Sequence, residues 1–349
     1  MLSFECDYNQ GCHEKILEAL SRTNYEAQPG YGADLYSASA ERRIRSACDC
    51  PEAEVFFISG GTQTNQLVIG TMLDSHEGVL SAKTGHIACH EAGAIEYSGH
   101  KVLELPQEDG KICGKDLTAW LEVFYADESI DHLVFPGMVY LSHPTEYGTL
   151  YTASELREIR EICDKYDLKL YVDGARLGYA LGVADCDVTL PLLGELCDAF
   201  YIGGTKVGAL CGEALVFPRK SPKHFLTKIK QRGAMLAKGR LIGIQFDTLF
   251  TDGLYMSLGA HGVQMARKIR DCFLDCGYEL YKPTITNQVF VILTEGQVRA
   301  LSEDLRFTHW ENIGDGRMVV RLAASWATTP EEVARLRQIL EQYKEETVC

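Results

Sequence analysis

Short apolar segments alternate with helical patterns through the first part of the chain, and this alternation limits the folds open to it. Residues 54–58 read as a strand and are followed at once by a glycine-rich turn and a helix. A helix is expected over 153–166, where Leu156, Ile159 and Cys163 share one face. Further strands are predicted at 79–81, 101–105, within 133–141, at 168–172 and at 199–202. Such alternation predicts an α/β fold with a mainly parallel sheet covered by helices on both faces.

The pattern changes after about residue 247. A long helical stretch is expected from about Leu249 to Asp275, followed by strands at 287–293 and 317–322. The last helix is predicted over 329–346, because Thr329-Pro330-Glu331-Glu332 is a capping box with proline at the first helical position. We therefore expect three parts, namely an N-terminal arm over 1–20 that packs on the small domain, a large domain over 21–247 and a small α+β domain over 248–349.

The chain has 349 residues and a net charge of −15, which argues against nonspecific binding to nucleic acid or acidic membranes. A single phosphate site needs only a few local donors and is not excluded. No apolar stretch reaches the length of a membrane span, and residues 1–10 do not form a secretory signal. The 13 cysteines are therefore expected to be reduced in a cytoplasmic protein, and their spacing predicts no metal site.

A glycine-rich turn, Ser59-Gly60-Gly61-Thr62-Gln63-Thr64-Asn65, joins a predicted strand to a predicted helix. Glycines let the backbone approach an anion closely, and the free N–H groups of a helix start favour phosphate. The turn matches neither a Walker loop nor the GxGxxG pattern. Phosphate binding and a plain strand-to-helix turn both remain open from this segment alone.

Two charged residues follow predicted strands directly. Asp173 ends a buried-looking strand, where a carboxylate can keep a pyridine nitrogen protonated or can simply cap a turn. Lys206 follows Gly203, Gly204 and Thr205, and its amine would be poorly solvated among such small residues. Desolvation lowers the pKa of an amine and makes it nucleophilic, although a solvated loop lysine is the alternative.

The order of these three signals resembles the threonine aldolase / β-eliminating lyase family of fold-type I enzymes that use pyridoxal phosphate (PLP). The resemblance extends along nearly the whole chain. It implies a large domain with a mainly parallel sheet and a smaller C-terminal domain. The matching segments are Gly30-Tyr31-Gly32, 59–65, Gly85-His86-Ile87, 91–94, 142–148, 172–176 and Gly203-Gly204-Thr205-Lys206.

The resemblance implies roles for residues that would hold the cofactor. Lys206 would carry PLP as a Schiff base, and Asp173 would pair with the pyridine nitrogen. His86 would stack on the ring, although His86, His90 and Glu91 could instead suggest a metal site. The other residues implied at the cofactor are Gly61, Thr62 and Thr205 at the phosphate, Arg176 nearby, and Arg240 reaching the phosphate of a neighbouring subunit.

The resemblance also implies substrate contacts. Arg176 and Arg321 would hold the carboxylate of an amino acid, a task that suits a bidentate guanidinium, although an exposed edge arginine is the alternative for Arg321. Cys6 stands where the family often has a small hydroxyl residue, which puts that carboxylate contact in doubt. His143 would lie near the substrate hydroxyl or be structural. Tyr31 would cross between subunits, and the expected assembly is a homo-oligomer, dimer or tetramer, with shared active sites.

The activity implied is cleavage of L-threonine or L-allo-threonine to glycine and an aldehyde. His143, His86 or a water molecule that they hold would remove the hydroxyl proton. An alternative is a β-eliminating lyase or phenylserine-type aldolase acting on a bulkier amino acid. An alternative of another class is a non-catalytic PLP-binding protein, against which the joint presence of Lys206, Asp173, Arg176 and Arg321 speaks.

Overall fold

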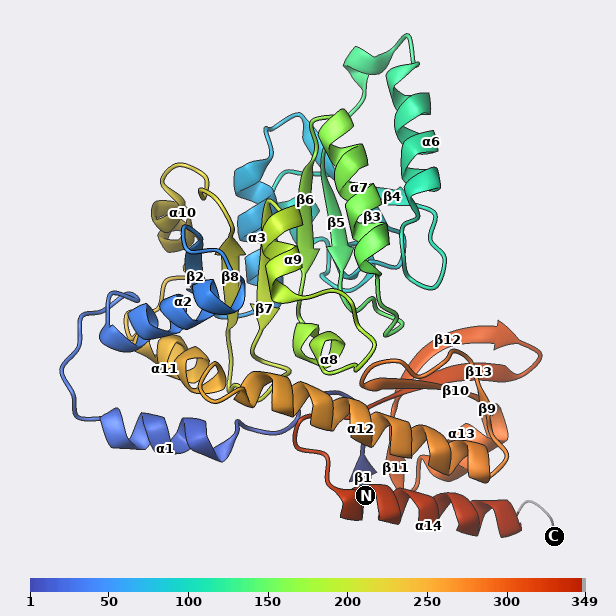
Figure 1. Cartoon of the computed structure of the whole chain (residues 1–349). Helices are drawn as coiled ribbons and strands as arrows, with labels where there is room; N and C mark the ends of the chain where they lie inside the picture. Colours follow the sequence, from blue (N-terminus) through green and yellow to red (C-terminus); the bar gives the residue numbers. More distant parts are fainter. Residues whose placement is uncertain (347–349) are drawn as a thin grey trace.

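The structure is a computed structural model, and it describes residues 1–346. Two sheets of unequal size form its framework, one with seven strands and one with four (Figure 1). The long helix α12 (Leu254–Asp275) packs against α8 (Leu177–Leu181) beside the large sheet, and against β10 (Gln288–Thr294) and α14 (Pro330–Glu346) beside the small one. This helix therefore connects the two sheets.

The large sheet has the strand order β2-β8-β7-β6-β5-β3-β4. Its strands are parallel except β8, which runs antiparallel to both of its neighbours. The predicted α/β fold with a mainly parallel sheet is confirmed. β8 was not predicted, although its five residues are buried throughout, like those of the predicted β7. The strands are β2 (Glu54–Ile58), β3 (Glu77–Ala82), β4 (Val102–Leu105), β5 (Phe135–Ser142), β6 (Lys169–Asp173), β7 (Ala199–Gly203) and β8 (Glu213–Phe217).

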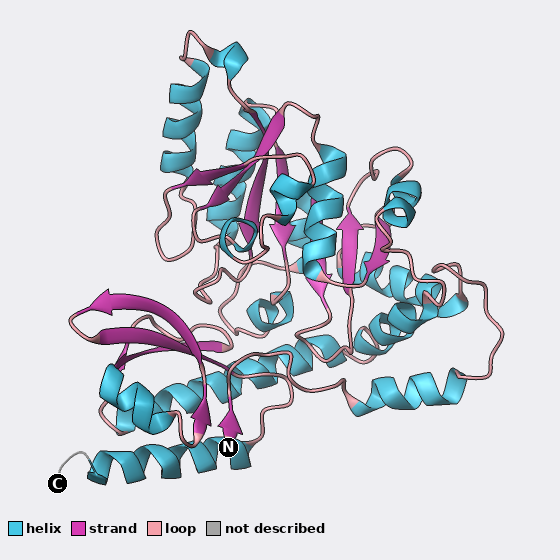
Figure 2. Cartoon of the chain, turned by 180° about the vertical axis from the view of Figure 1, so that it is seen from behind, coloured by secondary structure: helices cyan, strands magenta, loops and turns pink. Residues whose placement is uncertain are grey.

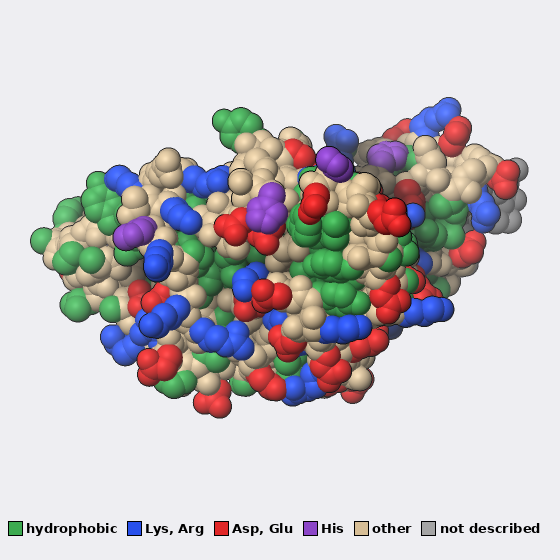
Figure 3. Space-filling model, turned by 90° about the horizontal axis from the view of Figure 1, so that it is seen from above, with side chains coloured by type: hydrophobic (Ala, Val, Ile, Leu, Met, Phe, Trp, Pro, Cys, Tyr) green, Lys and Arg blue, Asp and Glu red, His purple; other side chains and the backbone are tan. Residues whose placement is uncertain are grey.

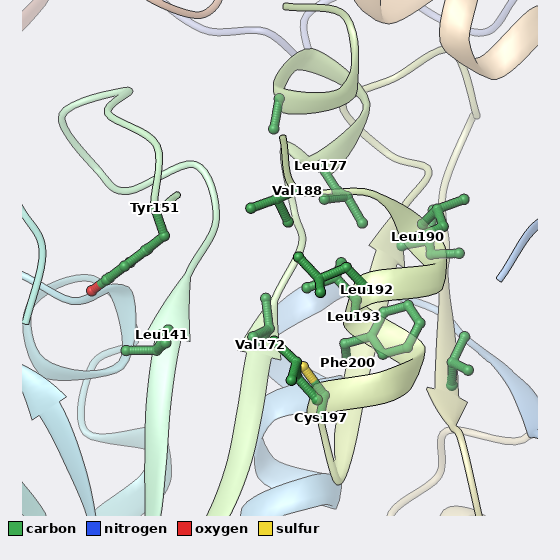
Figure 4. Close-up of a cluster of buried hydrophobic side chains, with 14 of the residues drawn as sticks. Leu141, Tyr151, Val172, Leu177, Val188, Leu190, Leu192, Leu193, Cys197 and Phe200 are labelled. Carbon is green, nitrogen blue, oxygen red and sulfur yellow. The ribbon is translucent and has the colours of Figure 1, made fainter. Parts of the chain in front are cut away.

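Helices cover both faces of the large sheet (Figure 2). Because successive strand residues point to opposite faces, Leu170 and Val172 belong to one apolar cluster and Tyr171 to another. Figure 4 shows part of the first cluster, where Val172 and Phe200 lie beside Leu193 of α9. The helices of this region are α1 (Glu14–Thr23), α2 (Leu35–Ala47), α3 (Gly61–Met72), α4 (His86–Cys89), α5 (Ala94–Tyr97), α6 (Gly114–Tyr125), the 3₁₀ helix Ile130–His132, α7 (Ala153–Lys165), α9 (Leu190–Leu196), α10 (Phe225–Gln231) and α11 (Arg240–Leu249).

The small sheet is antiparallel, with the order β12-β13-β10-β9, and it encloses a second apolar core with α12 and α14. Both predicted strands of this region are present. β12 was not predicted, because its sequence is polar and its pairing with β13 is interrupted by two irregularities. The remaining elements are β9 (Glu279–Leu280), α13 (Glu295–Leu301), β11 (Leu305–Arg306), β12 (Thr308–Gly314) and β13 (Arg317–Ala323).

Two predicted helix starts can be compared directly with the structure. The capping box is confirmed, since Thr329 Oγ1 accepts from Glu332 N at 3.1 Å and Glu332 Oε2 accepts from Thr329 N at 2.8 Å. The predicted start near Leu249 is wrong. α11 ends at that residue, and Gly253, with a positive φ of 68°, precedes the start of α12 at Leu254.

The N-terminal residues cross between the two sheets. β1 (Leu2–Ser3) pairs in parallel with β11, and Phe4 is buried in the core of the small sheet. α1 lies instead against α11, beside the large sheet. The domain limits at residues 20 and 247 remain predictions.

Two surface properties bear on possible partners. Within residues 1–346, no helix combines the length and the apolar character needed to cross a membrane. On the face shown in Figure 3, acidic and basic side chains are interspersed around apolar ones.

Candidate active site

A cavity of ≈ 550 Å³ lies between the carboxyl ends of the central large-sheet strands and the small sheet. This is the place where open α/β sheets bind ligands, because the loops after parallel strands converge there. The cavity is lined by Tyr8 near the N-terminus, by residues that follow β3, β5, β6 and β7, and by the strands β12 and β13. Its lining residues are Tyr8, Thr84, His86, Cys89, His90, Glu146, Tyr147, Arg176, Lys206, Thr308, His309, Trp310, Glu311 and Arg321.

Asp173 ends β6 and is buried at the base of this region. Its carboxylate accepts hydrogen bonds from Tyr140 Oη (2.6 Å), Tyr201 Oη (2.5 Å) and Asn65 Nδ2 (3.1 Å). Burial alone would raise the pKa of Asp173, but the nearby His86 and the two tyrosine hydroxyls outweigh burial and lower the pKa. The carboxylate is therefore held ionised and can stabilise a buried positive charge.

Lys206 follows β7 and lines the cavity, with its Nζ 5.9 Å from the centre of the Tyr8 ring. Burial lowers the pKa of its amine, and the positive charge of Arg176 lowers the pKa further. The neighbouring carboxylates of Asp7 and Asp173 oppose this change without cancelling it. A lowered pKa leaves more of the amine unprotonated and available for nucleophilic attack.

The loop that carries Lys206 is anchored by Glu213 of β8. One carboxylate oxygen of Glu213 accepts from Gly204 N at 2.9 Å and the other from Thr205 Oγ1 at 2.8 Å. Burial raises the pKa of Glu213 to about 7. Glu213 was not predicted as a site residue, because the strand that contains it was not predicted either.

His86 begins α4 at the cavity wall. Its Nδ1 is 3.1 Å from Oε1 of the buried Glu91, and that same oxygen accepts from Asn65 Nδ2 at 2.8 Å. Since Asn65 also binds Asp173, one network connects His86 to the carboxylate at the end of β6. The network fixes the orientation of the imidazole over the cavity. Among the described residues, no group of three His, Cys, Asp or Glu side chains is arranged to hold a metal ion.

The two arginines predicted at the site both line the cavity but differ in their partners. Arg176 donates twice to Asp7, from Nε at 2.7 Å and from a terminal nitrogen to the other oxygen at 3.0 Å. Arg321 has only neutral acceptors in the described part of the chain, Gln288 Oε1 at 3.2 Å, Thr308 Oγ1 at 3.3 Å and the Glu5 carbonyl at 3.4 Å. Burial, together with Arg176, lowers the pKa of Arg321 to about 10, so Arg321 is the cation that needs an anion.

The predicted phosphate residues lie close to this network without lining the cavity. Gly61 starts α3, and a Cβ there would lie 3.0 Å from Tyr201 Oη, the hydroxyl that binds Asp173. Thr62 is exposed at the same helix start. Thr205 is held by Glu213 and accepts from Gly212 N at 3.1 Å.

Besides Asp173 and the three predicted phosphate residues, four predicted site residues lie outside the cavity lining. His143 is fully buried beside Tyr151, and neither of its ring nitrogens has a partner among the described residues. Cys6 donates to Asn9 Oδ1 at 2.8 Å, two residues before the lining residue Tyr8. Tyr31 lines a different cavity of ≈ 240 Å³. Arg240 lines a third of ≈ 510 Å³ and binds the Glu26 carbonyl at 2.7 Å and Thr23.

Among the residues of the site that were not predicted are Tyr8, Tyr140, Glu146 and Trp310. Trp310 lies on the unpredicted β12, and its ring centre is 5.0 Å from the Arg321 guanidinium carbon. Glu146 belongs to the segment 142–148, which carried part of the family resemblance, but His143 was selected from that segment instead. The signal that could have found Glu146 is its position just beyond a predicted strand, which it shares with Asp173 and Lys206.

The whole chain is similar to known proteins. It is 30% identical over 341 residues to the low specificity L-threonine aldolase of Pseudomonas sp. (strain NCIMB 10558), covering 96% of this chain and 95% of that protein. A solved structure of Leishmania major threonine aldolase matches with a TM-score of 0.94 and 41% identity, covering 99% of this chain and 100% of that one. The histidinol-phosphate aminotransferase of Clostridium acetobutylicum, at 13% identity and a TM-score of 0.75, covers 99% and 100% and shares the fold.

The family comparison agrees with these full-length matches. Residues 8–308 match the family described as beta-eliminating lyase. This range contains Asp173, Lys206 and every lining residue of the cavity except four on β12 and β13, which are His309, Trp310, Glu311 and Arg321. The chain therefore belongs to the β-eliminating lyase family.

Proposed function

We propose that this chain is a PLP-dependent aldolase that cleaves L-threonine or L-allo-threonine to glycine and acetaldehyde. The observation that carries the proposal is the convergence on one cavity of Lys206 and of Arg321, a cation without an acidic partner among residues 1–346. The family and the similarity to proteins named as threonine aldolases support it. The family also implies the cofactor.

The residues around Asp173 fit a pyridoxal ring. Asp173 is buried, ionised and hydrogen-bonded by Tyr140 and Tyr201, and such a carboxylate suits a protonated pyridine nitrogen. Lys206 offers an amine with a lowered pKa on the cavity wall, close enough for the charge of Asp173 to act on that pKa. The twelve-residue helix α3 begins at Gly61, where backbone N–H groups and a missing side chain suit a phosphate. We propose Gly61, Thr62 and Thr205 as phosphate contacts, with His86 packing on the ring.

PLP, when bound, supplies an electron sink for the pair released as the Cα–Cβ bond breaks. The protein's part is to hold that bond in position. Arg321 is proposed to bind the substrate carboxylate, because its charge is buried and has no acidic partner among the described residues. Arg176 contributes positive charge beside it while held by Asp7. Cys6, near Tyr8, is proposed to contribute a weak contact at most.

His143 is less well supported as the group that takes the hydroxyl proton. Its ring is buried outside the cavity lining, and burial lowers its pKa to about 4. A base with so low a pKa would attract the proton only weakly at neutral pH. We therefore propose a structural role for His143 and leave His86 as the histidine that faces the substrate.

The proposed assembly is a homo-oligomer, dimer or tetramer, in which Arg240 and Tyr31 serve a neighbouring subunit's site. Both residues lie at cavities other than the one that holds Lys206. Arg240 is anchored by backbone carbonyls rather than by a carboxylate, so its charge remains available for a phosphate. A cytoplasmic location remains part of the proposal.

A specific observation favours a bulkier substrate as the second candidate. Tyr147, Trp310 and His90 form an aromatic wall on the cavity, with Tyr147 and Trp310 ring centres 5.9 Å apart. Such a wall can pack on an aromatic side chain, as in phenylserine, or on the substrate of a β-elimination.

The test is a substrate panel with the PLP-loaded protein. L-threonine, L-allo-threonine, D-threonine and L-phenylserine are supplied in parallel, and glycine and aldehyde are measured. We expect glycine and aldehyde in equal amounts from the L-isomers. Pyruvate and ammonia from serine, with no glycine from any β-hydroxy substrate, would assign β-elimination. No turnover by PLP-loaded protein would favour a non-catalytic PLP-binding protein.

A further inference from the structure

Glu146 lies just after β5, lines the cavity and is 6% exposed. One carboxylate oxygen, Oε1, accepts from Ser142 Oγ at 2.6 Å. The other, Oε2, has no hydrogen-bond partner among the described residues. A buried carboxylate oxygen without a partner is unfavourable, so a site that keeps one on a cavity wall is suited to a ligand that donates a hydrogen bond.

The position of Glu146 is set by the same residues that hold Asp173. Ser142 Oγ lies 3.3 Å from Tyr140 Oη, whose own proton is donated to Asp173 at 2.6 Å. Ser142 has one proton, and the shorter distance directs it to Glu146. Glu146 is therefore fixed through one oxygen relative to the carboxylate proposed to bind the pyridine nitrogen.

A β-hydroxy-α-amino acid brings complementary groups to this cavity. Its carboxylate matches Arg321, which has no acidic partner in the described part of the chain, and its amine is taken up by the cofactor. The β-hydroxyl is then the donor that remains, and Glu146 is a buried acceptor on the wall. Glu311 also lines the cavity with an oxygen that has no partner among the described residues, but it is less buried and lies on β12, away from the Asp173 network.

We propose that Glu146 is the catalytic residue that accepts the proton of the substrate's β-hydroxyl, an inference that rests on the proposed aldolase function. The O–H bond breaks, its proton moves to the Glu146 carboxylate, and its electron pair forms the aldehyde C=O bond. The Cα–Cβ electron pair stays with the glycine fragment, stabilised by the bound cofactor. A proton from solvent then adds at Cα and Glu146 releases its proton to solvent, so protons balance and the reaction needs no oxidant or reductant.

The surroundings of Glu146 suit this task. Burial raises the pKa of its carboxyl, which brings the group closer to the pH at which a general base works best. The bond from Ser142 and the charge of His86 limit the rise. The titratable or charged groups that interact with Glu146 are His86, Cys89, Tyr140, Tyr151, Asp173 and Arg176.

The experiment compares wild type, Glu146→Gln and Glu311→Gln as full-length, PLP-loaded proteins. Three quantities are measured, namely aldehyde release from L-allo-threonine, glycine binding from the change in cofactor absorbance, and deuterium exchange at the glycine Cα by NMR. Glycine has no β-hydroxyl, so the last two test the site without the proposed step. We expect Glu146→Gln to lower kcat for aldehyde release by about 10²–10⁴-fold, the usual loss for a general base. Glycine binding and exchange should change by less than about threefold, because the proposed contact of Glu146 is to the β-hydroxyl, which glycine lacks. Loss of a contact worth ~1.4 kcal/mol would instead change binding about tenfold.

The outcomes separate the two proposals. If Glu146→Gln retains aldehyde release, or if Glu311→Gln alone loses it, Glu146 is not the proton acceptor. An equal loss of glycine binding in Glu146→Gln would also overturn the inference, because the residue would then hold the site together. A wild-type protein that binds glycine and exchanges its proton but releases no aldehyde would overturn the aldolase function itself.

The pH profile and a conservative variant provide the second test. In wild type, kcat/KM should fall as the pH falls through the raised pKa of Glu146, because a protonated carboxyl cannot accept the hydroxyl proton. This acid limb should be absent in Glu146→Gln. Glu146→Asp keeps the carboxylate and should recover part of the activity and the acid limb. An acid limb unchanged in Glu146→Gln would assign it to another group and overturn the inference.

Discussion

The guanidinium of Arg176 and the carboxylate of Asp7 form a two-bond ion pair, with distances of 2.7 and 3.0 Å, that connects the N-terminal segment to the loop after β6. Asn287 Nδ2 completes the arrangement with a bond of 2.9 Å to Asp7. Both partners are largely buried, so each depends on the other for charge compensation. The pair thus holds Arg176 in place and leaves Arg321 as the cation available for a substrate anion.

Replacing Asp7→Asn should destabilise the protein strongly, because it leaves Arg176 buried without a counter-charge. The expected loss in the free energy of unfolding is about 3–5 kcal/mol, measured by urea unfolding at pH 7. Glu195→Gln, which breaks the exposed pair with Arg157, is the matched control and should cause no measurable change. Equal effects of the two variants would mean that burial does not govern the Asp7–Arg176 pair.

The same pair also predicts behaviour in acid. Burial raises the pKa of Asp7, but Arg176 and Lys206 outweigh it and lower the value from 3.8 to about 2. A carboxyl with a lowered folded-state pKa contributes stability above its unfolded pKa and loses it as the pH falls toward the folded pKa. That loss, about 2 kcal/mol from the difference of the two values, should therefore occur between about pH 4 and pH 2. Unfolding curves of wild type should show it, and those of Asp7→Asn should not.

Arg321→Lys should raise the KM for the amino acid, because an ammonium cannot bind a carboxylate in the two-bond geometry of a guanidinium. An increase of about tenfold corresponds to about 1.4 kcal/mol, within the range of one charge-assisted hydrogen bond. Arg317→Lys, four residues earlier on β13 and partly exposed, is the matched control. A KM that changes equally in both variants would remove Arg321 from the substrate site.

Much of this architecture could be predicted from the sequence. The strands that alternate with helices gave a strong local signal, as did the capping box at Thr329. β8 and β12 were both missed from the sequence. β8 is buried throughout and begins with the charged Glu213, whereas β12 is polar and irregular. Local pattern is uninformative in both cases, because their positions depend on neighbouring strands.

Some residues of the candidate site could be predicted from the sequence and others could not. Asp173 and Lys206 could be selected because each follows a recognisable strand, and the structure brings Lys206 and Arg321 to one cavity. The pairing of Arg176 with Asp7 joins residues far apart in the sequence, so no local pattern reveals that Arg176 is already compensated. Of His143 and Glu146, only Glu146 faces the cavity. This depends on the path of the loop after β5, which the sequence does not reveal.

Lys206→Ala should abolish the visible absorbance of covalently held PLP and lower aldehyde release by at least about 10³-fold, since a covalent attachment point is lost. Lys115→Ala serves as a matched control, because Lys115 is exposed on α6 and does not line any of the three cavities described above. Absorbance of the attached cofactor that survives in Lys206→Ala would place the anchor elsewhere.

His143 predicts a second, separate pH dependence. Burial lowers its pKa from 6.5 to about 4, so the unfolded chain binds a proton in this window while the folded protein does not. Stability therefore rises with pH between about 4 and 6.5, and about 3 kcal/mol should be lost as the pH falls through that range. His143→Leu replaces the unpartnered ring with an apolar side chain and should remove this part of the pH dependence. Unfolding free energies of wild type and His143→Leu, measured at pH 7 and pH 4.5, provide the test, and equal pH slopes would show that the imidazole is not held neutral.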